Sequence, residues 1–339
     1  MRVPSLPSSP FLVHEAATRA PAPLEKRKVR MVPDKIEVEG RDLRFAVSDN
    51  EDAHGPDGPG STPVWAVNVH GYFAGGGMYW RESSHLARSL GWRVVNQSLP
   101  GFGGSDPLPW EKVNLREISQ QLVELLDHLG TRHAVLLGHS MGGAVAVQFA
   151  HDHPGRTLGI VYRDGVATPG WRRRNGILFS MLSPVMPDVA GLADLMVAAL
   201  LDTSDLLVGR RLSSTVRGLW PDARRNLRAM GRTIPVGAML MSLDMEEEVQ
   251  SIVRNEIPFL PVWGCFDRIV NAATANELGR AVDREVQWLL GGHSWMLPRP
   301  RGQADVLLRL PRGQAFVEEM LSRRRRLLGL GARLRSIFR

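Results

Sequence analysis

Cysteine and long apolar runs are scarce in this 339-residue sequence. A single cysteine, Cys265, excludes an internal disulfide and fits a reducing compartment. No apolar run approaches the ~18–20 residues needed to span a bilayer, so we expect no membrane-spanning helix. The N-terminal residues show no charged segment leading into a continuous apolar core, so we expect no secretion signal. Together these features predict a cytoplasmic protein.

A net basic charge is lacking outside the C-terminal end. The formal net charge is +7, and residues 322–339 alone carry seven arginines and no acid. A nucleic-acid-binding domain would spread its charge over a folded face and carry a readable motif, so we expect no nucleic-acid partner. Apolar residues recur at near-helical spacing between these arginines, which is typical of a helix in peripheral contact with an anionic membrane. Packing on the body of the protein is the alternative.

The segment V-L-L-G-H-S-M-G-G, residues 135–143, is the most informative stretch of the chain. It predicts a buried strand, a sharp turn at Ser140 and a helix of small residues. A serine on such a turn has a strained backbone, and side chains larger than hydrogen at 138 or 142 would collide with the strand or helix. The turn would expose the Ser140 hydroxyl at the positive end of a helix.

Other motifs lie in a defined order around this turn. The dipeptide His70-Gly71 ends an apolar strand before it, whereas Asp267 and then His293 follow it, each after a further apolar strand. Ser, then Asp, then His is the chain order of the α/β-hydrolase triad. From about Lys35 to about Gln314 the sequence resembles the α/β-hydrolase superfamily. Within it, the sequence is similar to the cap-bearing branch with a serine nucleophile, which includes esterases, lipases, cofactor-free haloperoxidases and carbon–carbon bond hydrolases.

The resemblance implies an α/β fold with a mostly parallel central sheet, helices on both faces and an inserted helical cap. It implies a catalytic triad and an oxyanion hole, made by the following residues: Ser140 as nucleophile, His293 as base, Asp267 as acid, Asp164 as the alternative acid, and the backbone N–H groups of Tyr72 and Met141 as oxyanion donors. This chemistry requires no cofactor and no metal.

The patterning divides the chain into four parts: a flexible leader at 1–33, the hydrolase core at 34–164 and 258–312, a helical cap at 165–257, and a basic amphipathic tail at 313–339. Seven of the 13 methionines fall in the cap. Because methionine suits adaptable apolar surfaces, we expect an apolar small-molecule substrate, either an ester or another acyl compound. The glycine run at 75–77 is either a plain loop or room for an acyl chain beside the oxyanion hole.

The resemblance implies a serine hydrolase that cleaves carboxylic ester or thioester bonds through an acyl-enzyme intermediate. The same triad serves carbon–carbon bond hydrolases, acyltransferases and cofactor-free haloperoxidases or perhydrolases, so all of these stay open. Related dehalogenases and epoxide hydrolases have an aspartate at the turn, and Ser140 argues against both. A non-catalytic ligand-binding protein with this fold is the alternative from a different class.

Overall fold

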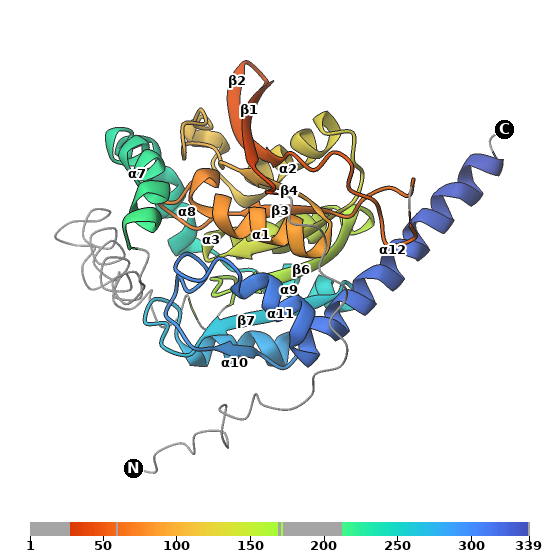
Figure 1. Ribbon diagram of the computed structural model, residues 1–339. Helices are drawn as coiled ribbons and strands as arrows, with labels where there is room; N and C mark the ends of the chain where they lie inside the picture. Colours follow the sequence, from red (N-terminus) through yellow and green to blue (C-terminus); the bar gives the residue numbers. More distant parts are fainter. Residues whose placement is uncertain (1–27, 59, 169–170, 172–211, 338–339) are drawn as a thin grey trace, which may run out of the picture.

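An eight-stranded sheet forms the centre of the computed structural model, which describes residues 28–58, 60–168, 171 and 212–337 (Figure 1). The spatial order of the strands is β1-β2-β4-β3-β5-β6-β7-β8. They are β1 (Met31–Val38), β2 (Arg41–Ser48), β3 (Trp65–Val69), β4 (Arg93–Gln97), β5 (Ala134–His139), β6 (Thr157–Arg163), β7 (Phe259–Gly264) and β8 (Gln287–Leu289). Strand β2 runs opposite to all the other strands. Its pairings with β1 and β4 are therefore antiparallel, and every other pairing in the sheet is parallel.

The apolar sequences of the central strands follow from their burial. All residues of β3, β5, β6 and β7 are buried, and each of these strands is a nearly continuous apolar run, as parallel strands covered on both faces must be. Strands β1 and β2 form the expected edge hairpin, joined by Glu39 and Gly40. Both turn residues are left-handed, with φ of 50° and 74°, which matches the twist of a two-residue hairpin turn.

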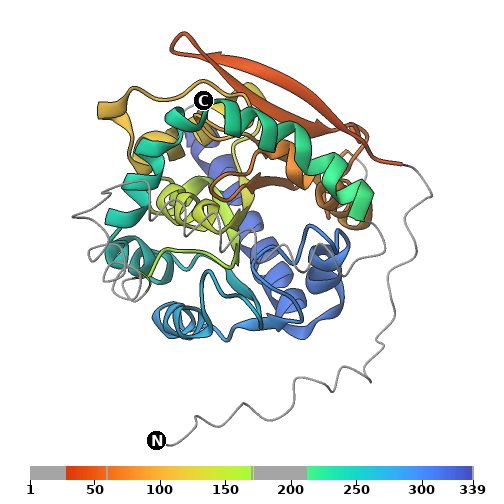
Figure 2. The same cartoon turned by 90° about the vertical axis from the view of Figure 1, so that its left-hand side faces the viewer.

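Helices cover both faces of the sheet (Figures 1 and 2). Side chains of α2, α3 and α10 build one apolar cluster with the sheet, and those of α1, α11 and α12 build the other. The helices of the described residues are α1 (Trp80–Leu90), α2 (Leu115–His128), α3 (Met141–Asp152), α7 (Leu212–Arg228), α8 (Ile234–Ser242), α9 (Glu246–Arg254), α10 (Ala272–Ala281), α11 (Gly302–Arg309) and α12 (Pro311–Ile337), with the short 3₁₀ helices η1 (Gly76–Tyr79), η2 (Trp110–Lys112), η3 (Pro154–Arg156) and η4 (Met230–Arg232). The predicted α/β architecture is confirmed.

Apolar periodicity between β6 and β7 predicts helices at 191–201, 204–219, 223–230 and 238–253, and the structure differs in detail from this pattern. Helices expected at 204–219 and 223–230 form a single helix, α7, within the described part of that stretch. The helix expected at 238–253 is broken after Ser242, where Leu243 turns to an extended backbone, and α9 then starts on three glutamates that favour a helix N-terminus. A further helix expected at 191–201 lies outside the described residues.

Helix α9 packs on α3, one of the helices that cover the sheet. Its Val249 and Ile252 are buried in the same apolar cluster as the side chains of α3. This helix falls within 165–257, the range expected to form a cap. It is in contact with the helical layer of the core.

Helix α12 begins at Pro311 and stays helical through Gly329, a residue expected to weaken its second half. Phe316 and Met320 are buried against the sheet. The Arg323 guanidinium donates to four backbone carbonyls, those of Pro154, Thr157, Asn255 and Glu256. The first half of the predicted tail is therefore anchored to the body of the protein.

The second anchor of α12 is Arg324, which pairs with Asp57 at 2.9 Å and also donates to the Thr62 carbonyl. Beyond it, Arg325 and Arg326 are exposed, and the helix runs on past the sheet toward the C-terminus (Figure 1). None of the helices within the described ranges is both long and apolar enough to cross a bilayer.

Candidate active site

All site residues predicted from the sequence lie at one edge of the sheet, because each of them lies in the segment that follows the carboxyl end of a strand. The turn at 70–72 follows β3, Ser140 follows β5, Asp164 follows β6, Asp267 follows β7, and His293 follows β8. The carboxyl ends of parallel strands are where sheets of this kind bind ligands.

Ser140 stands on a strained turn between β5 and α3. Its φ of 52° and ψ of −119° are rare for a residue with a side chain. A Cβ on Gly142 would lie 2.1 Å from the Val69 carbonyl oxygen, and one on Gly138 would lie 2.5 Å from the Gly142 carbonyl oxygen. The glycines that flank Ser140 are therefore required by close packing. The Ser140 N–H donates to the Arg163 carbonyl at 2.9 Å, which ties the turn to β6.

Asp267 and His293 form a buried hydrogen-bonded pair. The distance from His293 Nδ1 to Asp267 Oδ2 is 2.9 Å, and the two side chains are 6% and 1% exposed. The other carboxylate oxygen of Asp267 accepts from the backbone N–H groups of Ile269 and Val270, both at 2.8 Å. These two donors fix the carboxylate so that Oδ2 faces the imidazole.

His139, the residue before Ser140, connects the turn to His293. Its Nε2 donates to the His293 carbonyl at 2.9 Å, and the two imidazole rings are 4.8 Å apart. Its Nδ1 accepts from the Tyr79 hydroxyl at 2.6 Å. Burial lowers the pKa of His139 well below its usual range, which keeps the ring neutral and fits one donating and one accepting nitrogen. Neither His139 nor Tyr79 was predicted as a site residue, although His139 adjoins the serine.

Asp164, the alternative acid, lies beside Asp267 rather than apart from it. One Asp164 oxygen accepts from the Gly264 N–H and the other from the Trp295 indole N–H, both at 2.8 Å. One carboxylate oxygen of Asp164, one of Asp267 and one imidazole nitrogen of His293 all lie within 4.8 Å of one another. Burial, reinforced by the charge of Asp267, raises the pKa of Asp164 well above its usual range. This shift favours the neutral form of Asp164, and Asp267 is the carboxylate that is hydrogen-bonded to the imidazole.

The turn expected to supply one oxyanion donor lies against Ser140. A Cβ on Gly71 would lie 3.1 Å from the Ser140 Cβ. His70 locks the turn, because its Nδ1 donates to the Gly71 carbonyl at 2.7 Å while its Nε2 accepts from the Leu99 N–H at 2.8 Å. Burial lowers the pKa of His70 to about 4, so the ring is neutral at pH 7. The other expected donor residue, Met141, opens α3.

The glycines at 75–77 do not provide room for an acyl chain, so that interpretation is wrong. A Cβ on Gly75 or on Gly77 would lie 2.6 Å from Oδ2 of Asp222 in α7. A Cβ on Gly76 would lie 2.8 Å from the Asn96 carbonyl oxygen. These glycines are needed because neighbouring groups approach the backbone closely.

A buried ion pair, which no sequence motif predicted, lies next to the strand ends that carry the site. Arg163 and Glu82 are 2.6 Å apart, with side chains 0% and 1% exposed. Arg163 also donates to the Asn68 side chain and to the Leu137 carbonyl, both at 2.7 Å. These bonds link β3, β5, β6 and α1 directly beneath the strand ends.

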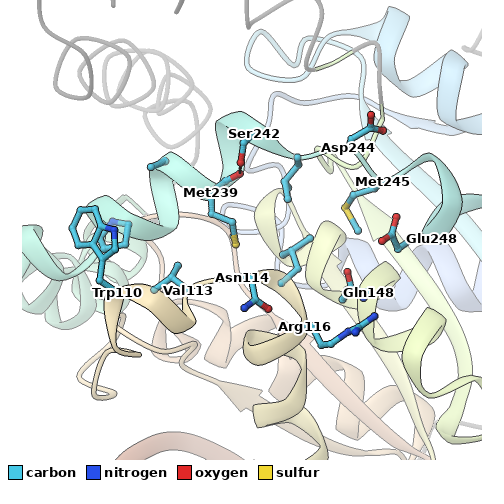
Figure 3. Close-up of a pocket in the computed structure, with 14 residues that line it drawn as sticks. Trp110, Val113, Asn114, Arg116, Gln148, Met239, Ser242, Asp244, Met245 and Glu248 are labelled. Carbon is cyan, nitrogen blue, oxygen red and sulfur yellow. Dashed lines mark hydrogen bonds between the residues drawn. The ribbon is translucent and has the colours of Figure 1, made fainter.

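A pocket of about 660 Å³ lies between α8 and α9 on one side and α2 and α3 on the other (Figure 3). Met239 and Met245, two of the seven methionines noted above, line it together with the exposed Trp110. Met181, Met186 and Met196 lie outside the described residues. The described residues that line the pocket do not include Ser140 or His293, so it is separate from the candidate active site.

Comparisons with known proteins agree with this fold. A family model described as alpha/beta hydrolase fold matches residues 67–219. The AB hydrolase superfamily protein YisY of Bacillus subtilis is 26% identical over 67% of this chain and 84% of its own length. A putative non-heme haloperoxidase of Mycobacterium phage D29 is 25% identical over 71% and 85%. The solved structure of an esterase from Exiguobacterium antarcticum has a TM-score of 0.60 at 16% identity, covering 83% of this chain and 97% of the esterase.

Proposed function

This chain belongs to the α/β-hydrolase superfamily, and we propose that it is a serine hydrolase that cleaves carboxylic ester or thioester bonds of apolar acyl substrates. The observation that carries the proposal is the buried Asp267–His293 hydrogen bond next to the strained turn at Ser140. A nucleophile, a base and a group that orients the base are the parts that acyl transfer to a serine needs.

The proposed mechanism follows from the proton positions. Asp267 accepts the Nδ1–H of His293, which leaves the Nε2 lone pair to take the Ser140 proton as Oγ attacks the acyl carbonyl. The N–H groups of Tyr72 and Met141 bind the oxyanion, and His293 returns its proton to the leaving alcohol or thiol. Water, deprotonated by His293, then attacks the acyl-enzyme. The bond from the acyl carbon to Ser140 Oγ breaks, the carboxylic acid leaves, and His293 returns the proton to Oγ. Asp267 stabilises the charged imidazole in both steps.

One feature of the sequence supports an apolar substrate. The region between β6 and β7 holds seven of the 13 methionines, and methionine suits adaptable apolar surfaces. The carbon–carbon hydrolase, acyltransferase and haloperoxidase alternatives use the same three side chains. We propose ester or thioester hydrolysis first because the residues at the site supply all of its parts.

The proposal is tested with p-nitrophenyl esters of two to twelve acyl carbons and with a fluorophosphonate probe. We expect a burst of p-nitrophenol equal to the enzyme concentration, followed by slower turnover, and complete inactivation by the probe. No turnover at any chain length together with no labelling would reject it. Tight binding of an apolar ester with no turnover would favour the ligand-binding alternative.

We also propose that the end of α12 makes a peripheral contact with an anionic membrane, from a cytoplasmic location that suits the free, exposed Cys265. Arg323 and Arg324 are bonded to the body of the protein, whereas Arg325 and Arg326 are exposed. The sequence supplies three more arginines after them, at 333, 335 and 339. Arginines near a membrane surface attract anionic lipids, and salt screens this attraction.

A sedimentation experiment with vesicles tests the membrane contact. The full chain is expected to pellet with phosphatidylserine-containing vesicles at low salt, and several-fold less at 0.5 M salt, because the Debye length shortens. A chain ending at Leu328 keeps both anchoring arginines and is expected to lose most of the binding. Vesicles of phosphatidylcholine are the control. Equal pelleting of both chains would refute the contact.

A further inference from the structure

The backbone loop that carries Tyr72 is held by a helix that arrives 150 residues later in the chain. Asn226 of α7 donates from its amide to the carbonyls of Phe73 at 2.7 Å and Ala74 at 2.9 Å. Its side-chain oxygen accepts from the Gly103 N–H at 2.9 Å. Asn226 is 1% exposed, and these three bonds use both ends of its amide.

Asp222 makes the second contact, one helical turn earlier on the same side of α7. It is 2% exposed, and its carboxylate lies against Gly75 and Gly77 so closely that neither could carry a side chain. Burial raises the pKa of Asp222, and the guanidinium of Arg225, which donates to Asp222 Oδ1 at 3.1 Å, opposes this rise. Figure 2 shows α7 crossing in front of the segment that contains η1, and the two elements are in contact.

A third contact reaches Tyr72 itself. The Tyr72 hydroxyl donates to the Thr233 carbonyl at 2.8 Å, and a Cβ on Gly237 of α8 would lie 2.7 Å from that hydroxyl oxygen. Between these contacts Phe73 has a φ of 62°, a left-handed backbone that a side chain disfavours. Such a backbone persists only where the surrounding structure holds it, and Asn226 bonds the carbonyl of this residue.

We propose that residues 222–237, which lie outside the triad, position the backbone N–H of Tyr72 in the oxyanion hole, with Asn226 and Asp222 as the positioning residues. This inference rests on the proposed function. It means that the region between β6 and β7 does more than cover the site, because any shift of α7 also shifts an oxyanion donor. A misplacement of about 1 Å is enough to cost a large part of the rate.

Two isosteric substitutions test the inference without opening a cavity. Asn226→Asp places a carboxylate against the Phe73 and Ala74 carbonyls. Asp222→Asn removes the charge that pairs with Arg225 and leaves an uncharged amide against Gly75 and Gly77. Each is expected to lower kcat on p-nitrophenyl acetate about 10- to 100-fold, less than the complete loss of one oxyanion donor, with KM within about twofold. Inhibition by a trifluoromethyl ketone, whose adduct carries the oxyanion, is expected to weaken by a similar factor.

Arg224→Gln, at an exposed position of the same helix, is the matched control and is expected to leave kcat unchanged. If the wild-type protein neither turns over esters nor reacts with the fluorophosphonate, the proposed function is wrong and the inference falls with it. If the wild type is active and the folded variants keep kcat within twofold, the inference alone is overturned. Equal weakening of ester and ketone binding with kcat unchanged would also overturn it. Two variants are used so that either one still tests the inference if the other does not fold.

Discussion

Ser140→Ala is expected to lower kcat on a p-nitrophenyl ester by about 10⁴- to 10⁶-fold, because removal of the hydroxyl removes the covalent route. The remaining rate would come from the oxyanion donors and from binding of the ester. The fold should survive, since alanine meets the same strain as serine at a φ of 52° and needs no more space. The measurement is a comparison of steady-state rates and melting temperatures for the wild type and the variant.

Ser84→Ala is the matched control for this substitution. Ser84 lies in α1, where its hydroxyl donates to the Trp80 carbonyl, and it takes no part in the candidate site. The control is expected to keep the wild-type kcat. A folded Ser140→Ala protein with more than about a hundredth of the wild-type rate would be incompatible with Ser140 as the nucleophile.

Asp267→Asn is expected to lower kcat/KM by about 10³- to 10⁴-fold, because an amide N–H₂ facing His293 favours the tautomer that cannot accept the Ser140 proton. Asp164→Asn is expected to cost less than tenfold. The raised pKa of Asp164 already favours its neutral form in the folded protein, and a neutral amide keeps a donor toward Asp267. An asparagine at 164 has one acceptor oxygen in place of the two that accept from Gly264 and Trp295. The free energy of unfolding should therefore fall by about 1 kcal/mol.

The two carboxyl substitutions control for each other, since the side chains are equally buried neighbours of the same imidazole. Rates are to be measured from pH 6 to 9, with melting temperatures taken at each pH. The reverse ranking, with Asp164→Asn nearly inactive and Asp267→Asn nearly unaffected, would make Asp164 the acid of the triad.

The strands and the turn at Ser140 were predictable because their signals are local. Strands β3, β5 and β7 are buried on both faces and therefore appear as short apolar runs bounded by glycine or proline. The turn is flanked by glycines for steric reasons that any sequence with this geometry shares. The order of the later motifs then placed Asp267 and His293 at the same sheet edge, where the structure brings them within hydrogen-bond distance.

Contacts between distant segments left no local signal. A glycine run indicates either a loose loop or a close approach, and at 75–77 only the position of Asp222 distinguishes the two. The sequence left open whether the basic tail contacts a membrane or packs on the body, and Arg323 and Arg324 are buried by carbonyls and an acid from other elements. The Arg163–Glu82 pair was missed for the same reason, since its partners are 81 residues apart.

The helices between β6 and β7 were predicted with wrong boundaries because apolar periodicity continues across their breaks. The pattern over 238–253 suits one helix, but Leu243 leaves the helical backbone before the glutamates of α9 begin a new one. The buried polar residues of α7 could not be recognised from the sequence either. Asn226 in a helix is usually solvated, and only its three bonds to the loop beside Ser140 indicate a role.

The most direct measurement is the mass of the protein after reaction with a fluorophosphonate, followed by peptide mapping of the adduct. The account predicts one phosphonyl group per chain, on the peptide that contains Ser140, and none in the Ser140→Ala protein. A stable adduct on any other residue, or an active esterase whose Ser140 stays unmodified, would contradict it.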